Sequence, residues 1–134
     1  MNHPQEPQLI ELACQVRRRA HAPYSRFQVG AALRTRGGVF VGCNVENASF
    51  GLTMCAERAA VFHAVAGGER EFELLVLASS GGAPPCGACC QVLAEFCADL
   101  PMLLIDVERE NRITRIRLSD LLPHRFELSR ISEK

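Results

Sequence analysis

Three cysteines and one glutamate have the residue types and spacing needed for metal-assisted chemistry. Cys86 and Cys89 form a C-x-x-C pair, and Cys55 opens the triplet C-A-E about thirty residues earlier. The sulfur atoms of a C-x-x-C pair at a helix start can face one point and hold one tetrahedral metal ion. Adding Cys55 gives three ligands, which leaves one coordination position for water, as in a catalytic zinc site. Glu57 then lies beside the metal and is a candidate general acid and base.

The predicted helices and strands bring both cysteine motifs to the same end of a sheet. Strong helix formers follow Cys55, a second helix is expected to open at Cys86, and a strand or loop precedes each helix. The fold class is therefore predicted to be α/β, with a mixed sheet of about five strands and helices on its faces. The predicted elements are, in chain order, a helix that starts near residue 6 and ends before Pro23, a hairpin of strands 27–35 and 39–43 whose glycines supply positive φ angles, a helix at 55–66, a strand at 74–79, a helix at 86–100, strands at 102–107 and 113–118, and a one-turn helix with a tail at 119–126.

Length and charge narrow the class of protein. At 134 residues the chain is expected to form one domain that spans residues 1–134. Lys plus Arg and Asp plus Glu are equal, at 15 each, which disfavours binding to nucleic acid or to an acidic membrane. No apolar run approaches the ~20 residues of a membrane span, and no export signal precedes the first helix, so a cytoplasmic location is expected.

The seven cysteines, an odd number, favour metal or thiol chemistry over a disulfide framework. Cys14 and Cys97 are interpreted as small apolar residues in the buried stripes of their helices. Two further interpretations stay open: a C-x-x-C redox pair of the thioredoxin type, and a zinc-stabilised binding module with Cys90 as a fourth ligand. The redox interpretation does not explain Cys55 or Glu57, and the binding module gives Glu57 no task.

Five sequence blocks together carry a resemblance to a known family. They are A-P-Y-S-R-F-Q-V-G-A-A-L (22–33), G-C-N-V-E-N-A-S-F-G-L (42–52), C-A-E-R (55–58), P-C-G-A-C-C-Q-V-L-A-E-F (85–96) and L-L-P-H-R-F (121–126). Together they resemble the zinc-dependent cytidine deaminases, in particular their small homotetrameric class. The resemblance implies a three-layer α/β/α cytidine deaminase-like fold, one Zn²⁺ per subunit, and a homotetramer whose subunits share active sites. It also implies hydrolysis of cytidine and 2'-deoxycytidine to the uridines, with release of ammonia, in pyrimidine salvage. A nucleoside-like antibiotic or a modified cytidine is the alternative substrate.

The resemblance also assigns the residues of the reaction centre. Cys55, Cys86 and Cys89 match the zinc thiolates, and Glu57 matches the proton shuttle. Zinc would activate the attacking water as hydroxide, and Glu57 would pass its proton to the pyrimidine N3 and later to the departing amine. Because three thiolates leave the zinc centre with a net charge near −1, Arg58 and the two helix N-termini are expected to compensate it.

A second group of residues matches the nucleoside contacts of the family. Asn44 and Glu46 match the pair that bonds the ribose hydroxyls, and Phe27 matches a residue that packs on the pyrimidine. Ala56 lies between a ligand and the acid, so its backbone is expected to contact the base. Phe126 matches an aromatic residue that a neighbouring subunit inserts toward the site.

Two positions differ from the family pattern. Phe50 stands where many relatives have tyrosine, so any intersubunit hydrogen bond from that hydroxyl is lost. Cys90 stands where an arginine usually follows the third ligand, which places more of the charge compensation on Arg58. Neither change is expected to abolish activity.

Overall fold

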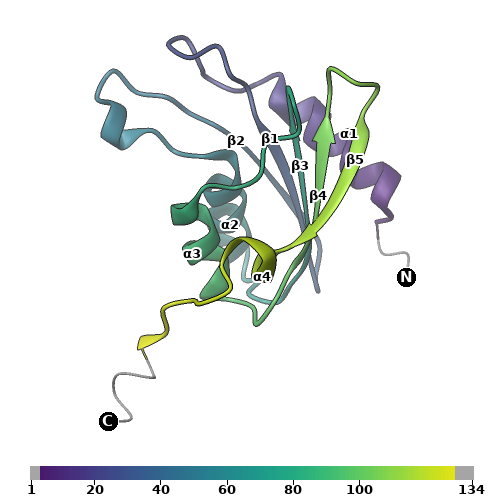
Figure 1. Cartoon of the computed structure of the whole chain (residues 1–134), viewed down its shortest axis with the longest axis vertical. Coiled ribbons are helices and arrows are strands. Elements are labelled where there is room, and N and C mark those ends of the chain that lie inside the picture. Colours follow the sequence, from purple (N-terminus) through teal and green to yellow (C-terminus); the bar gives the residue numbers. More distant parts are fainter. Residues whose placement is uncertain (1–3, 129–134) are drawn as a thin grey trace.

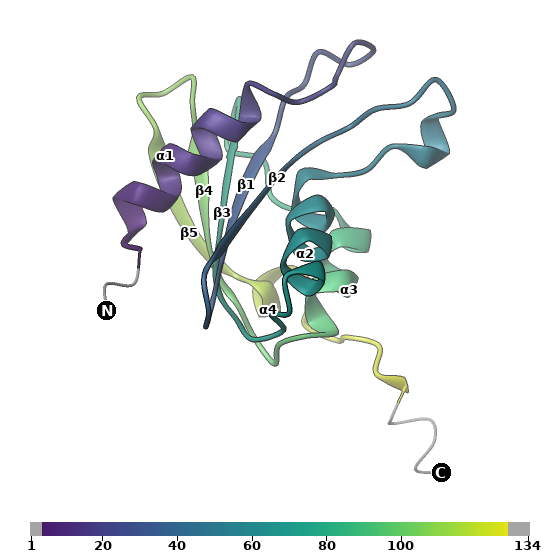
Figure 2. The same ribbon diagram turned by 180° about the vertical axis from the view of Figure 1, so that it is seen from behind.

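The computed structural model describes residues 4–128 and contains a twisted sheet with helices on both faces (Figure 1). The elements are α1 (Glu6–Arg17), β1 (Gly30–Thr35), β2 (Val39–Cys43), the 3₁₀ helix η1 (Phe50–Leu52), α2 (Ala56–Ala66), β3 (Phe72–Ser79), α3 (Gly87–Ala94), β4 (Pro101–Asp106), β5 (Arg112–Arg117) and α4 (Leu118–Leu121). The sheet has five strands in the order β2-β1-β3-β4-β5, with β3 and β4 parallel and the other neighbours antiparallel. Helix α1 lies on one face, and α2 and α3 lie on the other (Figure 2). The predicted three-layer α/β/α fold with a mixed sheet is confirmed.

The central strands of the sheet, β1, β3 and β4, are buried on both faces and are apolar at most positions. In β3, Leu75 and Leu77 pack with α2 and α3, whereas Leu74 and Val76 pack with α1. Strands buried on both faces read as continuous hydrophobic runs, which is the pattern seen in the sequence. Among residues 4–128 no helix is both long and apolar enough to cross a membrane.

Two glycines allow the helices to lie directly on the hairpin strands. A Cβ atom at Gly42 would come within 2.5 Å of the Ala60 nitrogen and 2.6 Å of the Ala56 oxygen, both in α2. On the opposite face, a Cβ atom at Gly30 would lie 2.0 Å from the Ala13 oxygen of α1. The backbone of α2, which carries the C-A-E motif, is therefore in direct contact with β2.

The glycines of the hairpin turn act differently from the prediction. The structure gives positive φ angles to Gly68, Gly81 and Gly82, but not to Gly37 or Gly38. Glycine is instead needed at position 37 because a side chain would not fit there: a Cβ atom at Gly37 would lie 2.4 Å from the carboxylate of Glu69. The Gly37 N–H donates to that carboxylate at 2.8 Å, so a distant side chain stabilises the turn.

Helix α3 is shorter than predicted, since it ends at Ala94 and not near residue 100. The guanidinium of Arg125 donates to the carbonyl oxygens of Ala94, Cys97 and Ala98, which replaces the hydrogen bonds of a longer helix. Pro101 also disfavours helical backbone at the residue before it. The placement of Cys97 in a helical stripe is therefore wrong. Cys97 is half-buried after the helix, and burial raises the pKa of its thiol to about 11.

We predict that Gly42→Ala lowers the free energy of unfolding by about 1–3 kcal/mol, because the added methyl group must push α2 away from β2. Urea denaturation followed by circular dichroism measures the change. Gly51→Ala is the matched control, since a Cβ atom at Gly51 meets nothing within 4 Å. Equal urea midpoints for the two variants would contradict the contact.

Candidate active site

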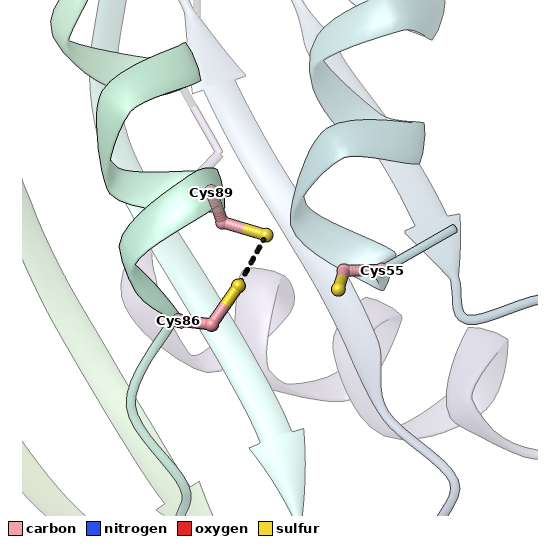
Figure 3. A group of neighbouring side chains, drawn as sticks. All are labelled: Cys55, Cys86 and Cys89. Carbon is pink, nitrogen blue, oxygen red and sulfur yellow. Dashed lines mark hydrogen bonds between the residues drawn. The ribbon is translucent and has the colours of Figure 1, made fainter. Parts of the chain in front are cut away.

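Three cysteine sulfur atoms meet where α2 and α3 begin. Cys55 is the N-cap residue of α2, Cys86 is the N-cap residue of α3, and Cys89 lies in the first turn of α3. Their Sγ atoms all lie within 4.8 Å of one another, and those of Cys86 and Cys89 are 3.5 Å apart (Figure 3). A tetrahedral zinc ion with Zn–S bonds of about 2.3 Å needs sulfur atoms about 3.8 Å apart. The three thiols therefore fit one zinc ion, as the sequence predicts.

The loop between β3 and α3 positions Cys86. The Ser79 hydroxyl, fully buried at the end of β3, accepts the Ala83 N–H at 2.9 Å. The Gly81 N–H donates to the carboxylate of Asp106, in the neighbouring strand β4, at 2.9 Å. With positive φ angles at Gly81 and Gly82, the chain turns sharply and enters α3 at the cysteine pair.

The loop before α2 places Cys55 in a comparable way. Val45 and Met54 pair as an isolated antiparallel bridge and exchange two N–H···O bonds of 2.9 Å. This bridge closes the loop between them. It also fixes the position of Met54, the residue directly before Cys55. The cysteines at the starts of α2 and α3 thus follow two loops, each of which is stabilised by its own hydrogen bonds.

Positive charge surrounds the sulfur cluster. The N-termini of α2 and α3 each contribute roughly half a unit of partial positive charge. Arg58 donates from its Nη2 atom to the Cys55 Sγ atom at 3.3 Å. Hydrogen bonds from the Cys89 thiol and from Arg58 lower the pKa of the Cys55 thiol to about 5. The same contact with Cys55, together with burial, raises the pKa of Cys89.

Glu57 lies in the first turn of α2 and is only 6% exposed. Burial raises the pKa of its carboxyl group above the ordinary value, and the negative charge of Cys55 adds to the rise. A buried carboxyl group with a raised pKa holds a proton more readily than an exposed one, which suits a group that takes up and returns a proton. The adjacent residue Ala56 is fully buried.

The residues expected to hold the nucleoside lie on two neighbouring loops, 21–29 and 44–54. Asn44 is 8% exposed; its Nδ2 atom donates to the Phe27 oxygen at 2.7 Å, and its Oδ1 atom accepts the Val29 N–H at 2.8 Å. The Glu46 carboxylate accepts the N–H groups of Tyr24 at 2.9 Å and Ser25 at 3.2 Å. These side chains therefore join the two loops to each other.

A pocket of about 340 Å³ lies between the same loops. Glu46 lines it, whereas Phe27, 40% exposed, is not among the lining residues. Of the residues expected at the nucleoside site, the structure thus places Glu46 in the pocket and Phe27 and Asn44 on the adjoining loop segments. The lining residues are Tyr24, Ser25, Glu46, Phe50 and Thr53.

Phe126 lies on the tail that follows α4 and is 58% exposed. The Gln91 side chain in α3 donates to the Phe126 oxygen at 3.2 Å, and Arg125 binds the carbonyl groups at the end of α3. The tail leads away from the sheet beyond these contacts (Figure 1). The sequence analysis did not identify Ser25 or Arg125. The position of Ser25, two residues before Phe27, was an available signal. No local sequence pattern indicated the role of Arg125.

Cys90 points into the core and not toward the sulfur cluster. It is 1% exposed, belongs to the core between the sheet and α2 and α3, and faces the Pro85 oxygen at 3.8 Å. Within residues 4–128, the group of side chains close enough to share one metal ion consists of Cys55, Cys86 and Cys89. The structure therefore does not support Cys90 as a fourth ligand.

Comparison with known proteins defines the class of this chain. Residues 4–103 match the family described as the cytidine and deoxycytidylate deaminase zinc-binding region. Cytidine deaminase from Halalkalibacterium halodurans is 48% identical over 122 residues, which is 88% of this chain and 91% of that protein. Cytidine deaminase from Mycobacterium tuberculosis is 49% identical over 116 residues, 81% of this chain and 80% of that protein.

A solved structure of a relative has the same fold as this chain. The crystal structure of cytidine deaminase from Burkholderia pseudomallei matches with a TM-score of 0.85 and 45% identity, covering 92% of this chain and 100% of that one. Fold and cysteine cluster define a zinc-binding deaminase. The chain belongs to the cytidine and deoxycytidylate deaminase family, and zinc is its cofactor.

We predict that Cys90→Ala keeps one zinc ion per chain, whereas Cys89→Ala loses the metal. The two cysteines are adjacent in α3 and both are buried, so they form a matched pair. The Cys90 change removes one core atom and leaves the ligand count unchanged, at a cost of about 1 kcal/mol in stability. The zinc-to-protein ratio of purified protein, measured by mass spectrometry of the metal, distinguishes the two positions. Zinc loss from Cys90→Ala would overturn the ligand assignment.

Proposed function

We propose that this chain is a cytidine deaminase, which hydrolyses cytidine and 2'-deoxycytidine to uridine and 2'-deoxyuridine with release of ammonia. The observation that carries the proposal is the three-cysteine cluster next to the buried Glu57, at the start of two helices. Relatives named cytidine deaminase reach 48% and 49% identity, whereas a relative named blasticidin-S deaminase, from Bacillus cereus, is 26% identical. The difference favours cytidine over a nucleoside-like antibiotic as the substrate. Its metabolic place is pyrimidine salvage.

The proposed mechanism uses Glu57 as the proton carrier. Zinc held by the three thiolates would supply an activated water for attack at C4 of the pyrimidine. Glu57 takes a proton from that water and gives it to N3 of the base. It then takes the proton of the new C4 hydroxyl group and gives it to the amine, so that ammonia leaves as the C4 carbonyl forms. The raised pKa of Glu57 supports this task, because the group must be a base in one step and an acid in the next.

Arg58 is proposed to keep the sulfur cluster from donating too much negative charge. Three thiolates and one Zn²⁺ carry a net charge near −1, which opposes loss of a proton from the water. The Arg58 hydrogen bond to Cys55 Sγ and the two helix N-termini withdraw part of that charge.

The nucleoside is proposed to bind between the loops that carry Phe27, Asn44 and Glu46, with the Ala56 backbone next to the base. An amide group has two N–H donors and two acceptor lone pairs, so Asn44 keeps one of each after bonding Phe27 and Val29. An ionised carboxylate has about four acceptor positions, so Glu46 also keeps capacity for a ribose hydroxyl. Phe27 is exposed enough to pack on the pyrimidine ring.

We infer a homotetramer in which Phe126 of one subunit completes the active site of another. The tail that carries Phe126 extends from the domain, and this side chain is more than half exposed. Several other large apolar side chains are also exposed and are available for contacts between subunits. They include Tyr24, Phe50, Leu52 and Phe62. The single domain over residues 1–134, the cytoplasmic location and the absence of nucleic-acid or membrane partners stay predictions of the sequence.

We predict that Glu57→Gln lowers kcat for cytidine by about 10²- to 10⁴-fold, because a positioned acid and base contributes that much. Zinc should be retained, since Glu57 is not a ligand. Ultraviolet absorbance and released ammonia follow turnover of cytidine, 2'-deoxycytidine, cytosine, cytidine monophosphate and blasticidin S. Wild-type protein that carries no zinc and cycles a Cys86–Cys89 disulfide would instead establish the redox interpretation.

We predict that Phe126→Ala raises KM for cytidine severalfold while zinc content stays unchanged. Leu128→Ala is the matched control on the same tail, since Leu128 is 70% exposed. Light scattering during size-exclusion chromatography gives the mass in solution, with four chains expected. A monomer with full activity, or equal KM values for both variants, would contradict a shared site.

A further inference from the structure

The hydroxyl group of Ser25 connects two residues expected to bind the nucleoside. Its Oγ atom donates to the Glu46 carboxylate and accepts the Phe27 N–H at 3.0 Å. The Ser25 N–H adds a second bond to Glu46, at 3.2 Å. One small side chain thus touches both the acidic residue of the pocket and the backbone of the aromatic residue beside it.

The backbone around Ser25 needs such support. Arg26, between Ser25 and Phe27, has a φ angle of 62°. This left-handed region is strained for a residue that carries a Cβ atom. Ser25 holds the Phe27 N–H on one side, and Asn44 holds the Phe27 carbonyl oxygen at 2.7 Å on the other. Two side chains therefore fix both polar backbone groups of Phe27.

The backbone of the second loop is joined to the first as well. The Glu46 N–H donates to the His21 oxygen at 2.7 Å, and the His21 N–H donates to the Asn44 oxygen at 3.0 Å. These bonds place the Glu46 backbone, but they leave the direction of its side chain free. The bonds from Ser25 and Tyr24 set that direction, and the Ser25 hydroxyl also lowers the pKa of Glu46, which keeps it an acceptor.

We propose that Ser25 is a positioning residue for nucleoside binding, which acts by holding the Glu46 carboxylate and the Phe27 backbone in place at the pocket. The inference rests on the proposed function. Ser25 is not assigned a contact with the reacting atoms, and it lies on a different element from the zinc ligands. Its loss should therefore weaken substrate binding and leave the chemical step intact.

The test compares Ser25→Ala with Ser25→Thr and with Ser49→Ala. Ser25→Ala should raise KM for cytidine about tenfold, equivalent to about 1.4 kcal/mol, with kcat within about twofold of wild type. Ser25→Thr keeps a hydroxyl and should restore most of the affinity. Ser49 lies on the adjoining loop and its side chain makes no cap bond to η1, so Ser49→Ala should match wild type. Unchanged KM in Ser25→Ala, or no rescue by threonine, overturns the inference.

A double-mutant cycle separates positioning from a general loss of structure. If Ser25 acts through Glu46, Ser25→Ala and Glu46→Gln together should raise KM by much less than the product of the single effects. If the effects of the two substitutions on KM multiply, the inference is overturned. An equal drop in kcat and in zinc content of Ser25→Ala also overturns it.

A binding measurement distinguishes failure of this inference from failure of the proposed function. In zinc-loaded Glu57→Gln protein, calorimetric titration should give a cytidine Kd that rises about tenfold when Ser25→Ala is added. Wild-type protein without cytidine turnover overturns the proposed function. An unchanged Kd, or no cytidine binding in this background, overturns the role of Ser25.

Discussion

The approach of three cysteine sulfur atoms to within 4.8 Å is the constraint on which the rest of the structure depends. As thiolates these groups repel one another, and a zinc ion offsets only two of their three charges. The N-termini of α2 and α3 and the Arg58 guanidinium supply the remaining positive charge. Both helices must therefore begin at the same place, and the sheet must hold them there.

The topology meets this requirement with two different connections. Helix α3 lies between the parallel strands β3 and β4, so it begins at the carboxyl end of β3, where ligand sites of α/β sheets commonly lie. Helix α2 reaches the same edge from a loop closed by the bridge between Val45 and Met54. Gly42 then lets the backbone of α2 lie against β2. The core packing thus sets the separation of the ligands.

The polar residues of the expected nucleoside site also hold their own loops together. Asn44 bonds the backbone of Phe27 and Val29, and Glu46 bonds the segment at Tyr24 and Ser25. A site ordered in advance loses less conformational entropy when a ligand binds. The same side chains can therefore serve architecture and recognition.

The sequence by itself determined the metal chemistry, the two helix starts and the five-stranded mixed sheet. The helix starts and strands are local features, since they depend on helix propensity and apolar runs in single segments, and the metal chemistry follows from the residue types and spacing of two short motifs. The tertiary structure alone decided where α3 ends, how Gly37 serves its turn, that Cys90 faces the core, and that Ser25 holds Glu46. Each of these depends on a partner from another segment: Arg125, Glu69, the sheet, or the facing loop. Contacts between segments distant in the chain leave no periodic pattern in the sequence, because packing creates them only when the fold is complete.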